Sequence, residues 1–185
     1  MPRMPYPDIG AASDAVQDLF AQLPVKLNIL RMTAHLEESC PALLQLGGKI
    51  LTAQKLSPLL RELAILRVAQ LSDAEYEWVQ HVPMAEAAGV SAGQIEALKR
   101  GERTGHCFTV EEAAVLAFTD EVLHNVRPSD ESLAAAREAL SDQEVVELTC
   151  AIGFYMLMAR IMEVTGVDVD GPAAQQVLDA LVKGG

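Results

Sequence analysis

Residues 57–81 of the chain read SPLLRELAILRVAQLSDAEYEWVQH, and these residues are the strongest indication of the fold. Nine of the thirteen residues from Leu59 to Leu71 are apolar, so the segment predicts a helix that is hydrophobic on nearly every side and lies inside a bundle. Glu62 stands in the middle of this helix. A carboxylate carried into a core must be paired, hydrogen-bonded or protonated, which makes Glu62 the first candidate for acid–base chemistry.

Helix start and stop signals recur along the rest of the chain and predict an all-α fold. Four pairs have the spacing of a capping box: Ser72 with Glu75, Ser91 with Gln94, Thr109 with Glu112, and Ser141 with Glu144. Ser57 followed by Pro58 is a further start signal, and three glycines are the expected stops, Gly89, Gly101 and Gly166. The predicted helices span 12–23, 25–36, 39–54, 58–71, 73–88, 92–100, 110–126, 130–140, 142–165 and 173–183. The connections are too short for parallel-strand crossovers, and no hairpin signal interrupts the helices.

We expect a single helical domain. Residues 1–24 are predicted to form an N-terminal extension with a short helix, and residues 25–185 the helical bundle itself. Only Ser72 and Asp73 connect the helices 58–71 and 73–88, so these two helices should pack as a buried antiparallel hairpin.

The second helix of this hairpin carries Glu77 and His81, which are four residues apart and share a face. At this spacing the Glu77 carboxylate could orient the imidazole. Pro83 lacks an amide donor, so it should kink the helix and free a backbone acceptor near His81. If the hairpin also brings Glu62 to this face, two carboxylates and a histidine would line one pocket.

Purely structural interpretations of the same residues stay open at this point. Glu77 and His81 could be a solvated pair that stabilises a helix by about 0.2–0.5 kcal/mol. Glu62 could be paired with an arginine such as Arg67 or Arg160 for stability alone.

The composition excludes several classes of partner and cofactor. A formal net charge of −12 without any Lys and Arg cluster argues against nucleic acid and anionic membranes. The three cysteines, Cys40, Cys107 and Cys150, are widely spaced and form no C-x-x-C pair, so neither a disulfide framework nor a thiolate zinc site is indicated. Cys107 follows His106 in a loop and is only a weak candidate for an activated thiol.

We expect neither a metal nor an organic cofactor. Glu77 and His81 are suitable ligands but have no evident third partner, because His35, His106 and His124 lie on separate elements. The first residues contain no apolar signal segment, and no later run approaches the roughly 18 apolar residues of a membrane span, so a cytoplasmic location is expected.

The stretch LRELAILRVAQLSDAEYEWVQHVPMAEAAGVS resembles the signature of the carboxymuconolactone decarboxylase and alkyl hydroperoxidase D superfamily. That family places a Glu twelve residues before a C-x-x-C-x-x-x-H motif. Glu62 fits the Glu and His81 fits the His, while Ala74 and Glu77 occupy the two cysteine positions. The chain therefore resembles a branch without the cysteine pair, and the resemblance extends through most of the chain beyond about residue 25.

This resemblance implies an AhpD-like helical fold and a cofactor-independent acid–base enzyme of the carboxymuconolactone decarboxylase type. The expected substrate is a small acidic lactone or keto acid, with Glu62, Glu77 and His81 as catalytic residues. Which residue donates the proton stays open. The alternatives are a peroxidase-like antioxidant protein and a non-catalytic oligomeric protein that binds a small molecule.

Three more residues are candidates for substrate binding: Trp78, Tyr155 and Arg160. Arg160 could clamp a substrate carboxylate. The resemblance also implies a homo-oligomer, either a trimer or a hexamer, and the many helices that are apolar on more than one face support this expectation.

Overall fold

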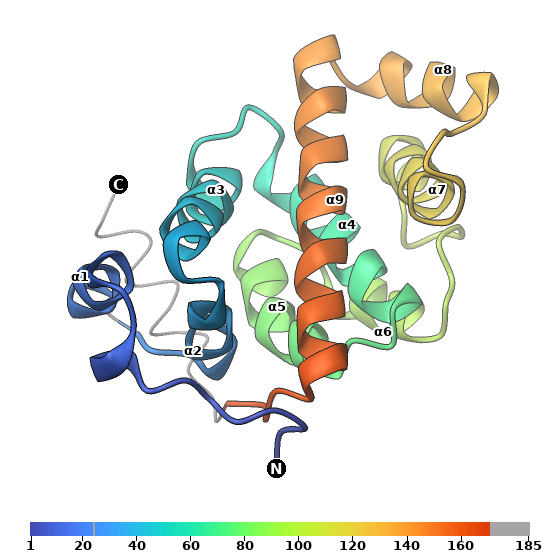
Figure 1. Cartoon of the computed structure of the whole chain (residues 1–185). Coiled ribbons are helices and arrows are strands. Elements are labelled where there is room, and N and C mark those ends of the chain that lie inside the picture. The colour runs from blue at the N-terminus through green and yellow to red at the C-terminus, as the bar shows by residue number, and fades with distance from the viewer. Residues whose placement is uncertain (24, 171–185) are drawn as a thin grey trace.

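The structure is a computed structural model that describes residues 1–23 and 25–170. Nine α-helices and two 3-10 helices follow one another in the described residues, which contain no strand (Figure 1). The elements are η1 (Ile9–Ala11), α1 (Asp14–Gln22), α2 (Asn28–Thr33), η2 (Ala34–Ser39), α3 (Cys40–Thr52), α4 (Pro58–Leu71), α5 (Glu75–Ala87), α6 (Ala92–Lys99), α7 (Val110–Asn125), α8 (Asp130–Ala139) and α9 (Asp142–Thr165). The predicted all-α fold is confirmed. The predicted helix 173–183 lies outside the described residues.

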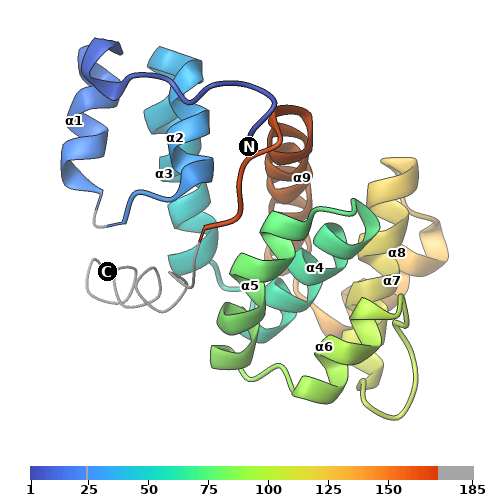
Figure 2. The ribbon, with the colours of Figure 1, turned by 90° about the horizontal axis from the view of Figure 1, so that it is seen from below.

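Helix α4 is the centre of the bundle. It packs against α5, α7 and α9, and ten of its residues are buried, as expected for a helix that is apolar on nearly every side. Ser57 caps its first turn by accepting a hydrogen bond from the Leu60 amide, and Pro58 occupies the first helical position. Figure 2 shows α4 and α5 lying side by side, so the predicted buried hairpin is confirmed.

Three of the four predicted capping boxes are present, at the starts of α6, α7 and α9. The fourth prediction, Ser72 with Glu75, is wrong. Ser72 ends α4, where its amide donates to the Val68 carbonyl, and Ala74 precedes the first residue of α5 without a side-chain cap. Asp73 absorbs the reversal of the chain with a φ of 49°. Ser72 therefore lies two residues before the N-cap position of α5 and cannot cap that helix.

The N-terminal helices differ from the prediction in detail. The segment 25–36, predicted as one helix, divides into α2 and η2, and Glu37 in η2 has a φ of 48°. The Glu37 carboxylate accepts a hydrogen bond from the Ser13 amide at the start of α1. Helix α1 packs on η2 and α3 through a small apolar cluster of its own, with Phe20 at its centre. The proposed boundary after residue 24 stays a prediction.

Helix α9 is the longest element and runs past α4. By length and composition it would also pass as a membrane span, so the expectation that no segment approaches one is wrong. Half of that stretch is buried inside the bundle. Burial of one side by neighbouring helices is typical of a helix at the surface of a bundle, and the opposite side of α9 remains exposed.

The chain after α9 turns back toward α5 (Figure 2). Asp170 accepts hydrogen bonds from the amide of Asn28, at 2.8 Å, and from the hydroxyl of Tyr76. Tyr76 belongs to the first turn of α5, so these hydrogen bonds connect the start of α5 with α2 and with the segment after α9.

Candidate functional site

Helices α4 and α5 bring Glu62 and His81 into direct contact. Nδ1 of His81 lies 2.8 Å from Oε2 of Glu62, and both side chains are buried, with exposed fractions of 7% for His81 and 1% for Glu62. Because a carboxylate only accepts hydrogen bonds, Nδ1 donates and Nε2 is the ring nitrogen left for chemistry. The prediction that the hairpin would bring Glu62 to the face of His81 is confirmed in its geometry.

The second oxygen of Glu62 faces Arg61. Nε and Nη2 of Arg61 each lie 3.3 Å from Oε1 of Glu62, and the arginine is itself buried. The arginines proposed from the sequence as structural partners are placed elsewhere. Arg67 forms a two-point ion pair with Asp120 of α7, at 2.6 and 2.8 Å.

Glu77 is also buried, with 2% of its surface exposed, so it is not part of a solvated surface pair. The expectation that it orients His81 is wrong, because Glu62 holds the imidazole instead. Neither oxygen of the Glu77 carboxyl has a hydrogen-bond partner in the described part of the chain. Burial raises the pKa of Glu77 well above its usual range, which favours the protonated form, and a protonated carboxyl can donate a hydrogen bond.

Tyr155 of α9 closes this cluster from the opposite side. Its ring meets the His81 ring edge to face, with 4.7 Å between the centroids, which fixes the plane of the imidazole. Burial raises the pKa of Tyr155 well above its usual value, and the nearby Glu62 carboxylate adds to the effect. The phenol of Tyr155 is therefore neutral at neutral pH.

Two predicted binding residues are not part of this cluster. Trp78 is half-buried and packs against the apolar core, with no polar contact to the site among the described residues. Arg160 is exposed and donates a hydrogen bond to the Met156 carbonyl of its own helix. Five residues correspond to about 140° around a helix, so Arg160 and Tyr155 point in different directions. Arg160 borders instead a hollow of about 320 Å³ between α9 and η2, together with His35 and Leu36.

Arg61 is the member of the cluster that did not stand out in the sequence. The signal was present, because Arg61 is one of only three charged residues in the apolar segment 58–71. A charge in a helix that is buried all round needs a partner, whatever its sign.

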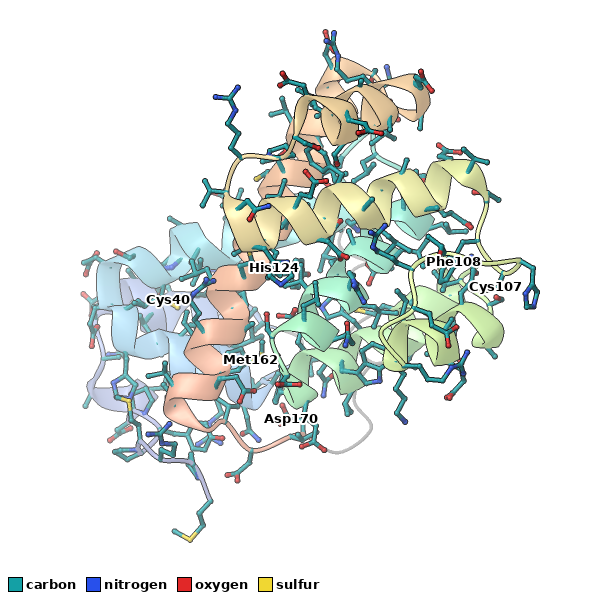
Figure 3. All side chains as sticks on the ribbon, turned by 90° about the vertical axis from the view of Figure 1, so that its right-hand side faces the viewer. Cys40, Cys107, Phe108, His124, Met162 and Asp170 are labelled. Atoms are coloured by element: carbon teal, nitrogen blue, oxygen red, sulfur yellow. The ribbon has the colours of Figure 1, made fainter. Side chains whose placement is uncertain are left out.

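The three cysteines lie on different elements, with Cys40 on α3, Cys107 in the loop before α7 and Cys150 on α9. Ala74 and Glu77 occupy the positions of the family's cysteine pair, and all three cysteines of the chain are free. Figure 3 shows Cys40 and Cys107 on opposite sides of the molecule. Burial raises the pKa of Cys40, so its thiol is a poor nucleophile. Within residues 1–23 and 25–170, no group of three His, Cys, Asp or Glu side chains could hold a metal ion.

Comparisons with known proteins agree with this geometry. Residues 38–121, which include α4, α5 and the two acids and histidine of the site, match the model of the carboxymuconolactone decarboxylase family. The resemblance seen in the sequence is therefore confirmed. None of the curated proteins matches the chain significantly.

Solved structures with the same fold share little sequence with the chain. A peroxidase-related protein from Ralstonia eutropha, described as an alkylhydroperoxidase AhpD core, has a TM-score of 0.78 at 16% identity, over 94% of each chain. A peroxidase-related protein from a Silicibacter species has the same TM-score at 17% identity, again over 94% of each chain. The debrominase Bmp8, as a cysteine-to-alanine variant in complex with 2,3,4-tribromopyrrole, gives a TM-score of 0.67 at 18% identity, over 90% of this chain and 87% of its own. The AhpD-like fold is thereby established.

Proposed function

We propose that the protein is a cofactor-independent lyase of the carboxymuconolactone decarboxylase type, which acts on a small acidic lactone or keto acid. One observation carries the proposal: a histidine held at Nδ1 by a buried carboxylate lies on the same helix face as a buried carboxyl group that has no hydrogen-bond partner among the described residues. This arrangement provides a proton carrier and a neutral acid in one apolar environment.

Decarboxylation needs both groups. The bond to the departing carboxylate breaks, its electron pair moves toward a carbonyl oxygen, and carbon dioxide leaves an enolate behind. The neutral carboxyl of Glu77 donates a hydrogen bond to the developing enolate oxygen, where charge accumulates in the transition state. A proton on Nε2 of His81 then passes to the carbon atom, while Glu62 holds the ring through Nδ1.

The alternatives have less support in the site. Ala74 and Glu77 replace both cysteines of the redox motif, so a thiol mechanism has no nucleophile and no resolving thiol there. A non-catalytic binding protein would have no use for a histidine that a buried carboxylate orients. The cytoplasmic location, a small-molecule substrate and the absence of nucleic-acid and membrane partners stay part of the proposal.

The test is release of carbon dioxide from carboxymuconolactone and from simple β-keto acids. Turnover by the wild-type protein should fall roughly 10²–10⁴-fold in the variants Glu62→Gln, Glu77→Gln and His81→Ala. Matched controls are Glu86→Gln, an exposed glutamate on the same helix as Glu77, and His106→Ala, an exposed loop histidine. These controls should keep wild-type turnover. Wild-type turnover at the uncatalysed rate with every substrate, or full turnover in His81→Ala, would refute the proposal.

A further inference from the structure

Arg61 carries the positive charge of the cluster, and its guanidinium is only partly satisfied. The residue is 7% exposed, and its Nε and Nη2 atoms share a single acceptor, Oε1 of Glu62. Both distances are 3.3 Å, longer than the 2.7–2.9 Å or so that is typical of a charge-assisted hydrogen bond. Among residues 1–23 and 25–170, Arg61 makes no other side-chain hydrogen bond or ion pair.

Glu62 is held more closely by His81 than by Arg61. The contact with Nδ1 of His81 is 2.8 Å, which is 0.5 Å shorter than either contact with Arg61. The Glu62 carboxylate therefore accepts hydrogen bonds from two residues, and the contacts with the permanently charged Arg61 are the longer ones. A buried guanidinium in this situation still attracts an anion.

The shape of the guanidinium shows where such an anion would bind. An arginine has five N–H donors, arranged so that the Nε–Nη2 edge and the Nη1–Nη2 edge can each receive the two oxygens of a carboxylate. Glu62 occupies the first edge. No acceptor from the described residues occupies the second edge, which matches the bidentate geometry of a carboxylate.

The other groups around Arg61 do not compete with an anion. Burial raises the pKa of Tyr155 and of Glu77, which favours the neutral form of each. Arg61 lies close enough to Tyr155 for its charge to act on the phenol, which places the guanidinium in the same cluster as the proposed acid and the histidine.

We propose that the Nη1–Nη2 edge of Arg61 binds a carboxylate of the substrate, namely one that remains on the product. This inference rests on the proposed function. A guanidinium stabilises the charge of a bound carboxylate and would oppose its loss as carbon dioxide. The carboxylate at Arg61 is therefore the anchoring group, and the bond that breaks lies on the side of Glu77 and His81. Arg61 thus takes the role that the sequence suggested for Arg160.

The test measures equilibrium binding of levulinate, a keto acid with one carboxylate, and of its uncharged methyl ester. Calorimetry measures the affinity, and the fluorescence of Trp78, the only tryptophan of the chain and the residue after Glu77 on α5, is a second readout. The wild-type protein should bind levulinate at least about tenfold more tightly than the ester. The variant Arg61→Gln should lose about tenfold to hundredfold in affinity for levulinate and keep its affinity for the ester.

Three further variants keep the outcome interpretable. Arg61→Lys retains the positive charge but lacks the paired Nη1 and Nη2 donors, so it should bind levulinate with intermediate affinity. This variant tests the inference if Arg61→Gln fails to fold. Arg67→Gln removes another buried, ion-paired arginine of α4 and should bind levulinate like the wild-type protein. No binding of levulinate by the wild-type protein, equal binding by Arg61→Gln, or loss of binding in Arg160→Gln instead would overturn the inference.

The binding results are separable from the test of the proposed function. Levulinate binding that depends on Arg61, without any release of carbon dioxide by the wild-type protein, would refute the decarboxylase proposal and leave the carboxylate site intact. Wild-type decarboxylation with an unchanged KM and unchanged binding in Arg61→Gln would refute the assignment of Arg61 alone.

Discussion

His81 and Glu62 share a hydrogen bond of 2.8 Å although they come from different helices of the hairpin. The three-residue connection between Leu71 and Glu75 forces α5 back along α4, so two residues nineteen positions apart meet inside the bundle. Tyr155 of α9 then packs against the imidazole edge to face. The orientation of the proposed proton carrier is therefore set by the packing of three helices.

Glu77→Gln should change how stability depends on pH. Above the usual carboxyl pKa of 4.5, the unfolded chain releases a proton that the buried Glu77 retains. The free energy of unfolding of the wild-type protein therefore falls as pH rises toward the raised pKa, by about 1.4 kcal/mol for each pH unit. The amide that the substitution introduces is neutral at every pH, so the unfolding free energy of the variant does not fall in this way. Melting curves from about pH 5 to about pH 8 should show a difference that widens in favour of the variant.

Glu86→Gln is the control for this measurement, because Glu86 is exposed on the same helix. Its melting temperature should follow that of the wild-type protein. Parallel pH curves for Glu77→Gln and the wild-type protein would show that the carboxyl of Glu77 is ionised in the folded state.

Glu62→Gln should destabilise the fold as well as reduce turnover. The substitution leaves Arg61 without its counter-charge in a buried position, which costs roughly 3–5 kcal/mol of unfolding free energy. In the double variant with Arg61→Gln, the loss should be smaller than the sum of the two single losses, because the pair is removed together. Urea unfolding measures all three values. Additive losses would mean that the two side chains do not interact.

Two neighbouring glycines of α3 should respond oppositely to alanine. A Cβ at Gly47 would lie 2.7 Å from Cζ of Phe154 on α9, so Gly47→Ala should cost about 1–3 kcal/mol. A Cβ at Gly48 would meet nothing within 4 Å, and Gly48→Ala should gain about 0.5–1 kcal/mol from helix propensity. Thermal or urea unfolding of both variants tests the packing of α3 on α9. Stabilisation by Gly47→Ala would contradict the close approach of these helices.

The exposed side of α9 should be an interface between copies of the chain. Val146, Leu157 and Val164 are 68%, 44% and 63% exposed and lie along one face of the helix. We expect the wild-type protein to sediment as a trimer or hexamer, and Leu157→Glu to shift it toward the 19.9 kDa monomer. Val110→Glu alters an apolar residue that is 90% exposed on α7 and is the control. A wild-type protein that is monomeric at micromolar concentration would refute the prediction.

Peroxide consumption with dithiol reductants should stay at the uncatalysed rate. Both positions of the family's cysteine pair lack a thiol, and Cys40 is buried with a raised pKa. Cys107 is half-buried in the loop before α7. If turnover appeared and disappeared in Cys107→Ser, this loop thiol would be the nucleophile after all.

Most helices, and the order in which they follow one another, could be predicted from the sequence. Capping boxes such as Thr109 with Glu112 and the apolar run of α4 act over a few residues, so local physics was enough to locate them. The same run predicted that Glu62 is buried, since no helix that is apolar on every side can keep one residue in water. Ser72 misled the prediction because one residue cannot end α4 and cap α5 together.

Which charged groups meet depends on the packing of the helices and could not be predicted from the sequence. Spacing along α5 favoured Glu77 as the partner of His81, but the closest carboxylate came from α4, and Glu77 was left without a partner in the described residues. The same packing placed Arg61 in the cluster and turned Arg160 outward. Periodicity fixes the face of a helix on which a side chain lies, whereas the distance between side chains of different helices depends on how those helices pack.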